Sequence, residues 1–238
     1  YDEFKTAFDT ILGGAGIESY SLSRFDMRFD SFDPEHYRDY AKLNRYLISA
    51  LAVTYNVQNC YDSRNLFSQK QLSVAIKNKR FECENYDKEA ESGGRDPAYA
   101  RLELRSKCLT SNDIEKQFHG WYTRLDKALK NLDKVHQRYN DELEKIYKEE
   151  KDAFPVKFRS LTDFLIQYQN CIFCKAQMVD LLSRFDEVKN PATRAKNHKK
   201  RYGIEYFSKM DVEYAVAEIK RAAEKFFKGT EMNLFEKS

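Results

Sequence analysis

The chain has 238 residues, of which 42% are hydrophobic and 33% are charged. This composition is typical of a globular protein with a substantial hydrophobic core and a heavily charged surface. The net charge is only +3, from 41 basic and 38 acidic residues, which excludes a uniformly basic nucleic-acid-binding protein. Any basic surface therefore requires a local concentration of lysine and arginine.

Targeting and redox signals favour a cytoplasmic protein without a membrane partner. The sequence contains no run of about 18 apolar residues, and its first residues do not form a signal peptide. Five cysteines are an odd number in a chain too long to need disulfide bonds, so we expect reduced thiols. Cys171 and Cys174 form a lone CxxC motif inside a helical pattern, which predicts core packing rather than a metal site.

The first half of the chain alternates helical and strand patterns. We expect a helix over residues 1–12, a strand over about 18–29 and a helix over 34–55. A β-hairpin over residues 71–89 and a further strand over 100–108 follow, each with apolar residues at every second position. This order predicts an α+β fold in which an antiparallel sheet has helices packed on one face.

The second half, from residue 110, is almost wholly helical. Apolar residues recur every three or four positions and predict one long helix over 112–148, a second over 160–185 and a third over 208–228. We therefore divide the chain into an α+β domain over residues 1–109 and an all-α helical domain over 110–238.

Carboxylates on the predicted strands form a candidate metal site. Asp26, Glu84 and Glu103 face the same side, and neighbouring strands lie about 4.8 Å apart, so these side chains could share a cation. Oxygen ligands of this kind favour Mg²⁺ or Mn²⁺. The four histidines are scattered without HxH or HExxH spacing, which argues against a zinc hydrolase or a two-histidine metal site.

Tyr86 is the candidate nucleophile on the same face, two residues after Glu84. A phenol has a pKa of about 10 and attacks well only when a metal or cation stabilises the phenolate. Lys88 and Arg105 could supply that charge and hold a phosphate, and we include both in the candidate catalytic set. Spacing alone supports equally well a solvated sheet face with cross-strand ion pairs.

Three segments on these strands resemble a known family. The first two are Tyr86-Asp87-Lys88-Glu89-Ala90-Glu91 and Arg101-Leu102-Glu103-Leu104-Arg105. They resemble the Tyr-Asp/Glu-Lys and Arg-x-Glu strands of rolling-circle plasmid and phage replication initiators (Rep proteins) and of related relaxases that lack the two-histidine motif. The third, Arg24-Phe25-Asp26, is similar to the strand that opens their catalytic sheet. The resemblance covers residues 20–108 in the right order, and the helical region does not align.

The resemblance implies an enzyme that nicks origin DNA. Tyr86 would attack a phosphodiester, keep the 5′-phosphate covalently and release a 3′-OH that primes synthesis. Asp26 and Glu103 would bind the metal, with Glu84 as an additional ligand, and Lys88 would contact phosphate. Residues 1–109 would be the catalytic domain. Origin DNA, single-stranded or supercoiled, and a host helicase are the implied partners.

Basic residues other than Lys88 and Arg105 are the candidates for DNA binding. Residues 194–201 form the densest basic stretch and follow a proline break, which predicts an exposed loop or helix start. The mixed charges of the helix over 112–148 favour bundle packing or a homodimer, so the helical domain would serve DNA binding or self-association. The DNA-binding candidates are Arg24, Arg28, Arg101, Arg194, Lys196, Lys199, Lys200 and Arg201.

Two rival functions remain open from the sequence. The chain could be a non-enzymatic DNA-binding or replication scaffold protein whose sheet face holds ion pairs, or a metal-dependent nuclease that uses water. The nuclease would tolerate the loss of Tyr86. The environment of Tyr86 separates the nicking enzyme from the non-enzymatic protein, because a nucleophile must be exposed beside clustered carboxylates. A structural Tyr86 would instead be buried with its hydroxyl paired.

Overall fold

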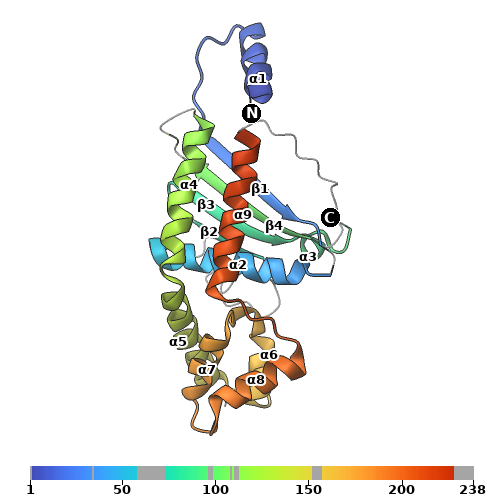
Figure 1. The fold of residues 1–238 in the computed structure, drawn as a ribbon, viewed down its shortest axis with the longest axis vertical. Coiled ribbons are helices and arrows are strands. Elements are labelled where there is room, and N and C mark those ends of the chain that lie inside the picture. Colours follow the sequence, from blue (N-terminus) through green and yellow to red (C-terminus); the bar gives the residue numbers. More distant parts are fainter. Residues whose placement is uncertain are drawn as a thin grey trace.

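The computed structural model describes residues 2–33, 35–57, 73–95, 99–107, 109, 113–151 and 157–227. Its centre is a four-stranded antiparallel sheet in the order β1-β4-β3-β2 (Figure 1). The strands are β1 (Arg24–Ser31), β2 (Val74–Lys77), β3 (Phe81–Asp87) and β4 (Ala100–Lys107). The helices are α1 (Asp2–Gly14), α2 (Tyr37–Tyr55), α3 (Lys88–Ser92), α4 (Ile114–Leu129), α5 (Leu132–Glu150), α6 (Leu161–Gln167), α7 (Lys175–Ser183), α8 (Pro191–Tyr202) and α9 (Lys209–Phe227). The predicted α+β class is confirmed.

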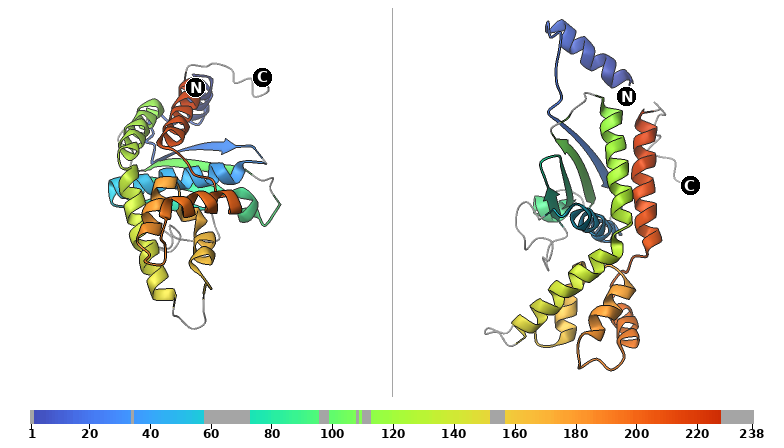
Figure 2. Two further views of the ribbon diagram at one scale, coloured as in Figure 1. Left: turned by 60° about the horizontal axis from the view of Figure 1, so that its bottom comes forward. Right: turned by 90° about the vertical axis from the view of Figure 1, so that its left-hand side faces the viewer.

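The sheet has one apolar face and one charged face, because side chains alternate along each strand. In β4, Ala100, Leu102 and Leu104 are buried, whereas Arg101 and Glu103 are partly exposed. Helices α2, α4 and α9 cover the apolar face (Figure 2), which confirms the prediction of helices packed on one side. The charged face is therefore the face that the sheet offers to a ligand.

Aromatic contacts hold α4 on the sheet. Phe118 lies 6.5 Å from Phe29 of β1 between ring centroids, and Trp121 lies 5.4 Å from Phe81 of β3 in an edge-to-face arrangement. The Trp121 indole nitrogen donates a hydrogen bond of 3.1 Å to the Ser106 hydroxyl. Edge-to-face aromatic pairs each contribute about 0.5–1.5 kcal/mol beyond the burial of their area. Although α4 follows residue 110, its core is thus shared with the sheet.

The helices α5, α6, α7 and α8 form a separate helical cluster at the end of the molecule opposite α1 (Figure 1). Tyr147 of α5 lies at its centre, with ring centroids 5.4 Å from Phe158, 5.1 Å from Phe164 and 4.7 Å from Phe185. One continuous hydrophobic core joins this cluster to the sheet.

The prediction of one helix over 112–148 is wrong. Lys130 and Asn131 separate α4 from α5, and the chain changes direction there (Figure 2). The Asn131 side-chain amide donates to the Lys127 carbonyl at 3.1 Å and to the Thr54 hydroxyl at 3.1 Å. A polar side chain that bonds to a helix carbonyl competes with the backbone ladder and promotes a break. The break leaves α4 on the sheet and directs α5 into the helical cluster.

The predicted helix over 160–185 is also divided. Ser160 caps α6 as expected, since its hydroxyl accepts from the Asp163 N–H. A short 3₁₀ turn, Gln169–Cys171, then precedes α7. Cys171 is buried in the core as predicted, but Cys174 is the N-cap of α7, where its sulfur accepts from the Gln177 N–H at 3.3 Å. The CxxC motif is therefore not inside a helix.

The structure also places the predicted basic stretch but does not describe the ends of several predicted elements. The basic stretch over residues 194–201, predicted as an exposed loop or a helix start, lies within α8, which begins at Pro191. Pro34, residues 71–72 and Cys108, at the ends of predicted elements, lie outside the described residues. Within the described part of the chain, no helix combines the length and apolar character needed to cross a membrane.

Candidate active site

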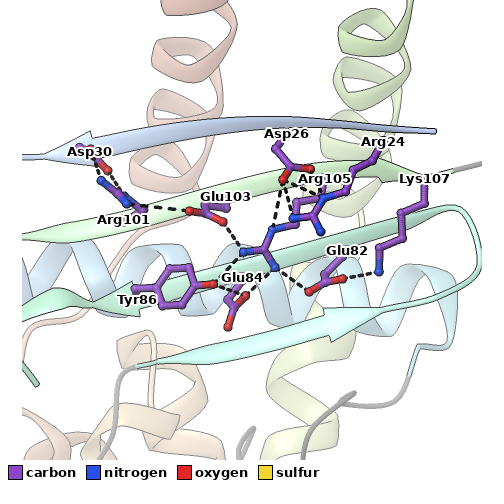
Figure 3. Close-up of polar contacts among 10 residues, drawn as sticks. All are labelled: Arg24, Asp26, Asp30, Glu82, Glu84, Tyr86, Arg101, Glu103, Arg105 and Lys107. Carbon is purple, nitrogen blue, oxygen red and sulfur yellow. Dashed lines mark hydrogen bonds and ion pairs between the residues drawn. The ribbon is translucent and has the colours of Figure 1, made fainter. Parts of the chain in front are cut away.

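The charged face of the sheet brings eight side chains from three neighbouring strands into one network, the Arg105 cluster (Figure 3). Strand register creates it: Arg105 of β4 stands opposite Asp26 of β1 on one side and Glu82 of β3 on the other. Strand alternation then adds the residues two positions away. The cluster consists of Arg24, Asp26, Glu82, Glu84, Tyr86, Glu103, Arg105 and Lys107.

Arg105 is the centre of the cluster. Its guanidinium group donates to Glu82 at 2.6 Å, to Glu84 at 2.7 Å and to Glu103. Only 8% of the residue is exposed. Burial alone would lower the pKa of Arg105, but hydrogen bonds from the guanidinium to Tyr86 and Glu103 outweigh it and raise that pKa. Arg105 therefore remains charged and neutralises the carboxylates around it.

Tyr86 lies beside Arg105 and is half-buried. Its hydroxyl donates to the Glu84 carboxylate at 2.5 Å and accepts from the Arg105 guanidinium at 2.7 Å. The Lys88 ammonium group lies 5.0 Å from the centroid of the Tyr86 ring. Burial and the hydrogen bond to Glu84 raise the pKa of Tyr86, so the side chain is a neutral phenol at neutral pH. Tyr86 thus combines the partial exposure expected of a nucleophile with the paired hydroxyl expected of a structural residue.

The two glutamates beside Arg105 differ in their electrostatics. Burial raises the pKa of Glu84, and the bonds from Tyr86 and Arg105 only partly offset this effect. Burial also acts on Glu82, but the bonds from Lys107 and Arg105 outweigh it and lower the Glu82 pKa. Glu84, which touches the Tyr86 hydroxyl, is therefore the more basic of the two carboxylates and the better proton acceptor.

The predicted metal ligands are neighbours in the sheet, but they surround an arginine. Glu84 and Glu103 are directly paired across β3 and β4, and both bond to Arg105, which also forms an ion pair of 4.0 Å with Asp26. Arg24 holds Asp26 through two bonds of 2.7 and 2.5 Å. Among the described residues, no three His, Cys, Asp or Glu side chains are arranged to hold a metal ion. The oxygen donors suit Mg²⁺ or Mn²⁺, but Arg105 occupies the position between them.

Other predicted residues lie at the edge of this network. Arg101 forms a bidentate pair with Asp30 at 2.7 and 2.9 Å, and an ion pair of 4.0 Å with Glu103. Arg28 is exposed on β1 opposite Glu103. Lys88 is the first residue of α3, so it is not on the strand as predicted. All three cations nevertheless lie on or beside the charged face.

The predicted cations of the helical region lie on α8. Ala195 and His198 point into the protein, whereas Lys196, Lys199, Lys200 and Arg201 are exposed. Arg194 is partly exposed and donates to the Thr162 hydroxyl, and Lys199 pairs with Glu205 at 3.2 Å. The helix contains no Asp or Glu, so its outer surface is basic from Arg194 to Arg201. Basic residues in the last turn also complement the helix dipole.

Sequence reasoning left Glu82, Asp30 and Lys107 out of the candidate site, although the structure places them in or beside the network. Strand alternation could have predicted them, because residues an even number of positions apart on a strand share a face. Each of the three lies two or four positions from a predicted site residue on its own strand. Counting all members, the cluster holds four carboxylates and three cations, so it is nearly neutral rather than basic.

Comparison with known proteins found no matching family model, no matching curated protein and no matching solved structure.

Proposed function

We propose that the protein is a replication initiator that nicks DNA through Tyr86. The observation that carries the proposal is the position of the Tyr86 hydroxyl between the Glu84 carboxylate and the Arg105 guanidinium on the charged face of the sheet. Of the three segments that resemble Rep proteins, residues 24–26 lie in β1, residues 101–105 lie in β4, and residues 86–91 span the end of β3 and α3. Because β4 lies between β1 and β3, Asp26, Tyr86 and Glu103 come together on one face. This adjacency supports a common site.

The arrangement supplies the parts that a transesterification needs. The Tyr86 oxygen forms a bond to phosphorus while the bond from phosphorus to the 3′ oxygen breaks, and the 3′ oxygen takes a proton from solvent. Glu84 accepts the phenolic proton across the existing 2.5 Å hydrogen bond. Arg105 lies 2.7 Å from the same oxygen and can stabilise charge on the phosphoryl group. No part of this step uses a metal, since Arg105 occupies the space between the candidate ligands.

DNA binding under this proposal depends on α8. Lys196 and Lys200 are one helical turn apart and make no ion pair among the described residues. Exposed cations of this kind bind phosphates through release of counterions. Packing of α7 against α8 presents the basic helix on the outside of the helical cluster. Origin DNA is the principal partner proposed, and a second copy of the chain and a host helicase are further proposed partners.

A second candidate function is DNA binding without cleavage. It is favoured by the two terminal nitrogens of Arg105, which already bond to three carboxylates and to Tyr86, while the Nε atom is buried without a hydrogen-bond partner among the described residues. A substrate phosphate would have to displace one of these partners. In this candidate function the cluster stabilises the sheet, and α8 alone contacts DNA.

One experiment distinguishes these functions. The protein is incubated with supercoiled plasmid and with labelled single-stranded oligonucleotides, with Mg²⁺, Mn²⁺ or EDTA, and the products are separated under denaturing conditions. A covalent DNA adduct that is lost in Tyr86→Phe but kept in Tyr214→Phe, an exposed tyrosine of α9, is the expected result. Cleavage that survives in Tyr86→Phe without an adduct would indicate a water-using nuclease. Binding without cleavage would favour the second candidate.

A further inference from the structure

A pocket lies where the helical cluster meets the helices that cover the sheet. It has a volume of about 460 Å³ and is lined by residues of α2, α4, α5, α7 and α9 and of the segment that precedes α9. We refer to it as the junction pocket. Its volume falls within the range of about 300–1,000 Å³ that is usual for small-molecule sites. It lies on the helix side of the sheet and shares no residue with the Arg105 cluster.

The wall of the junction pocket is positively charged. Lys130, Lys175 and Lys209 line it, and Asp133 is the single acidic residue that does so. Lys209 pairs with Glu213 at 3.5 Å, whereas Lys130 and Lys175 are exposed and make no ion pair among the residues that the structure describes. Three lysines against one aspartate give the pocket an excess of two positive charges. This excess matches an anionic ligand.

Three helices begin at this wall and one, α4, ends there at Leu129, so the partial charges of the helix ends are positive on balance. Leu132 is the first residue of α5, Cys174 is the N-cap of α7, and Lys209 is the first residue of α9. Each helix N-terminus carries a partial positive charge of about half an elementary charge. Backbone N–H groups at such ends bind phosphate and carboxylate readily. The lysines and the helix starts therefore act in the same direction.

Neutral polar groups complete the lining. The Tyr46 hydroxyl bonds to His136, and the Cys174 sulfur lies 3.5 Å from the same imidazole. Burial lowers the pKa of His136 and raises that of Cys174, so both are neutral at pH 7. The Tyr206 hydroxyl oxygen is buried and has no hydrogen-bond partner among the described residues. The hydroxyl has almost no accessible surface, so it belongs to the packed wall behind the pocket rather than to the surface that a ligand would contact.

We propose that the junction pocket binds a phosphorylated small molecule of nucleotide size. The phosphate would take the position among the lysines and helix starts, where it receives backbone and ammonium donors. The same phosphate monoester chemistry occurs on a free nucleotide and at the 5′ end of a nucleic-acid strand, so the test includes both. The proposal does not depend on the nicking activity.

The test uses the whole chain and measures binding of dAMP by calorimetry. Deoxyadenosine, which lacks the phosphate, and a 5′-phosphorylated trinucleotide are measured in parallel. We expect dAMP to bind and to slow alkylation of Cys174 by iodoacetamide, read peptide by peptide in a mass spectrometer, whereas deoxyadenosine does neither. Tighter binding of the trinucleotide than of dAMP would assign the phosphate to a strand end, and the reverse would assign it to a free nucleotide.

Two variants make the outcome decisive. Replacement of Lys130, Lys175 and Lys209 by Ala should weaken dAMP binding by at least about tenfold, which corresponds to about 1.4 kcal/mol, because it removes all three lysines that line the pocket. The matched control replaces Lys145, Lys189 and Lys225, three exposed lysines outside the pocket, and should keep the affinity. Absence of dAMP binding, equal binding of deoxyadenosine, or equal affinity in the two triple variants would overturn the proposal.

Discussion

Glu84 of β3 and Glu103 of β4 stand directly opposite each other in the sheet, and the guanidinium group of Arg105 bonds to both. Like charges in opposing positions destabilise a pair of strands unless a cation neutralises them. Arg105 performs this role from within β4 itself, two residues after Glu103. The charged face of the sheet is therefore stable only with Arg105 in place.

Replacement of Arg105 by Ala should lower the free energy of unfolding by about 3–5 kcal/mol, because it leaves buried or half-buried carboxylates without their counter-charge. Urea denaturation followed by fluorescence of Trp121, the only tryptophan, measures this loss. The control is Arg24→Ala, whose side chain is 50% exposed and should cost less than about 1 kcal/mol. Equal losses in the two variants would contradict a central role for Arg105.

Replacement of Glu84 by Gln should slow formation of the Tyr86–DNA adduct by about 100-fold, since it removes the acceptor of the phenolic proton. The measurement is single-turnover adduct formation at saturating DNA, so that weaker binding does not enter the rate. Glu218→Gln is the matched control, because Glu218 is also half-buried and paired with an arginine but lies on α9. An unchanged rate in Glu84→Gln would remove Glu84 from the proposed chemistry.

Lys42 should make stability rise with pH. Burial lowers its pKa from 10.5 to about 8, while the unfolded chain keeps the ordinary value. Between pH 8 and 10.5 the unfolded state therefore binds more protons, and Lys42 should add about 3 kcal/mol of stability across this window. Below pH 8 this contribution is absent, because the buried lysine is charged in both states.

Lys42→Met tests this dependence by the difference from the parent protein, since tyrosines and cysteines also titrate at high pH. Relative to the parent, the variant should lose about 3 kcal/mol between pH 8 and 10.5, as measured by denaturation followed by circular dichroism. Lys145→Met, at an exposed position, should show a constant difference. A constant difference for Lys42→Met would show that its pKa is not lowered in the folded protein.

Replacement of both Lys196 and Lys200 by Ala should weaken DNA binding about equally for all sequences. Each phosphate contact contributes about 0.7–0.9 to the slope of the logarithm of the association constant against the logarithm of salt concentration, so the loss of two contacts should make the slope shallower by about 1.4–1.8. Fluorescence anisotropy between about 50 and 200 mM salt measures the slope. The matched variant, Lys145→Ala with Lys189→Ala, should retain the parent slope. Identical slopes would place the DNA contact away from α8.

The strand pattern predicted the charged face of the sheet well, for a simple physical reason. Successive side chains on a strand point to opposite faces, so the sequence alone determines which residues share a side. Asp26, Glu84, Tyr86, Glu103 and Arg105 were expected together and lie together. The sequence could not predict that Arg105 would occupy the centre, because that depends on strand order and rotamers.

The helical region was harder to predict, because its decisive contacts are distant in sequence. The break between α4 and α5 depends on Asn131 bonding to Thr54, 77 residues away. The contact of Cys174 with His136 joins residues 38 positions apart on two helices. Apolar periodicity runs through both breaks without interruption, so the pattern alone predicts longer helices than the chain forms.

The bend at Asn131 sets the direction in which α5 leaves the sheet. The chain passes between the sheet and the helical cluster at this bend and again in residues 203–208, and Lys42 of α2 bonds to the Glu205 carbonyl in the second passage. Because α5 has 19 residues, it extends about 28 Å from the bend. A rotation of about 10° there displaces its far end by about 5 Å. The angle at Asn131 therefore determines how far the basic surface of α8 lies from the sheet.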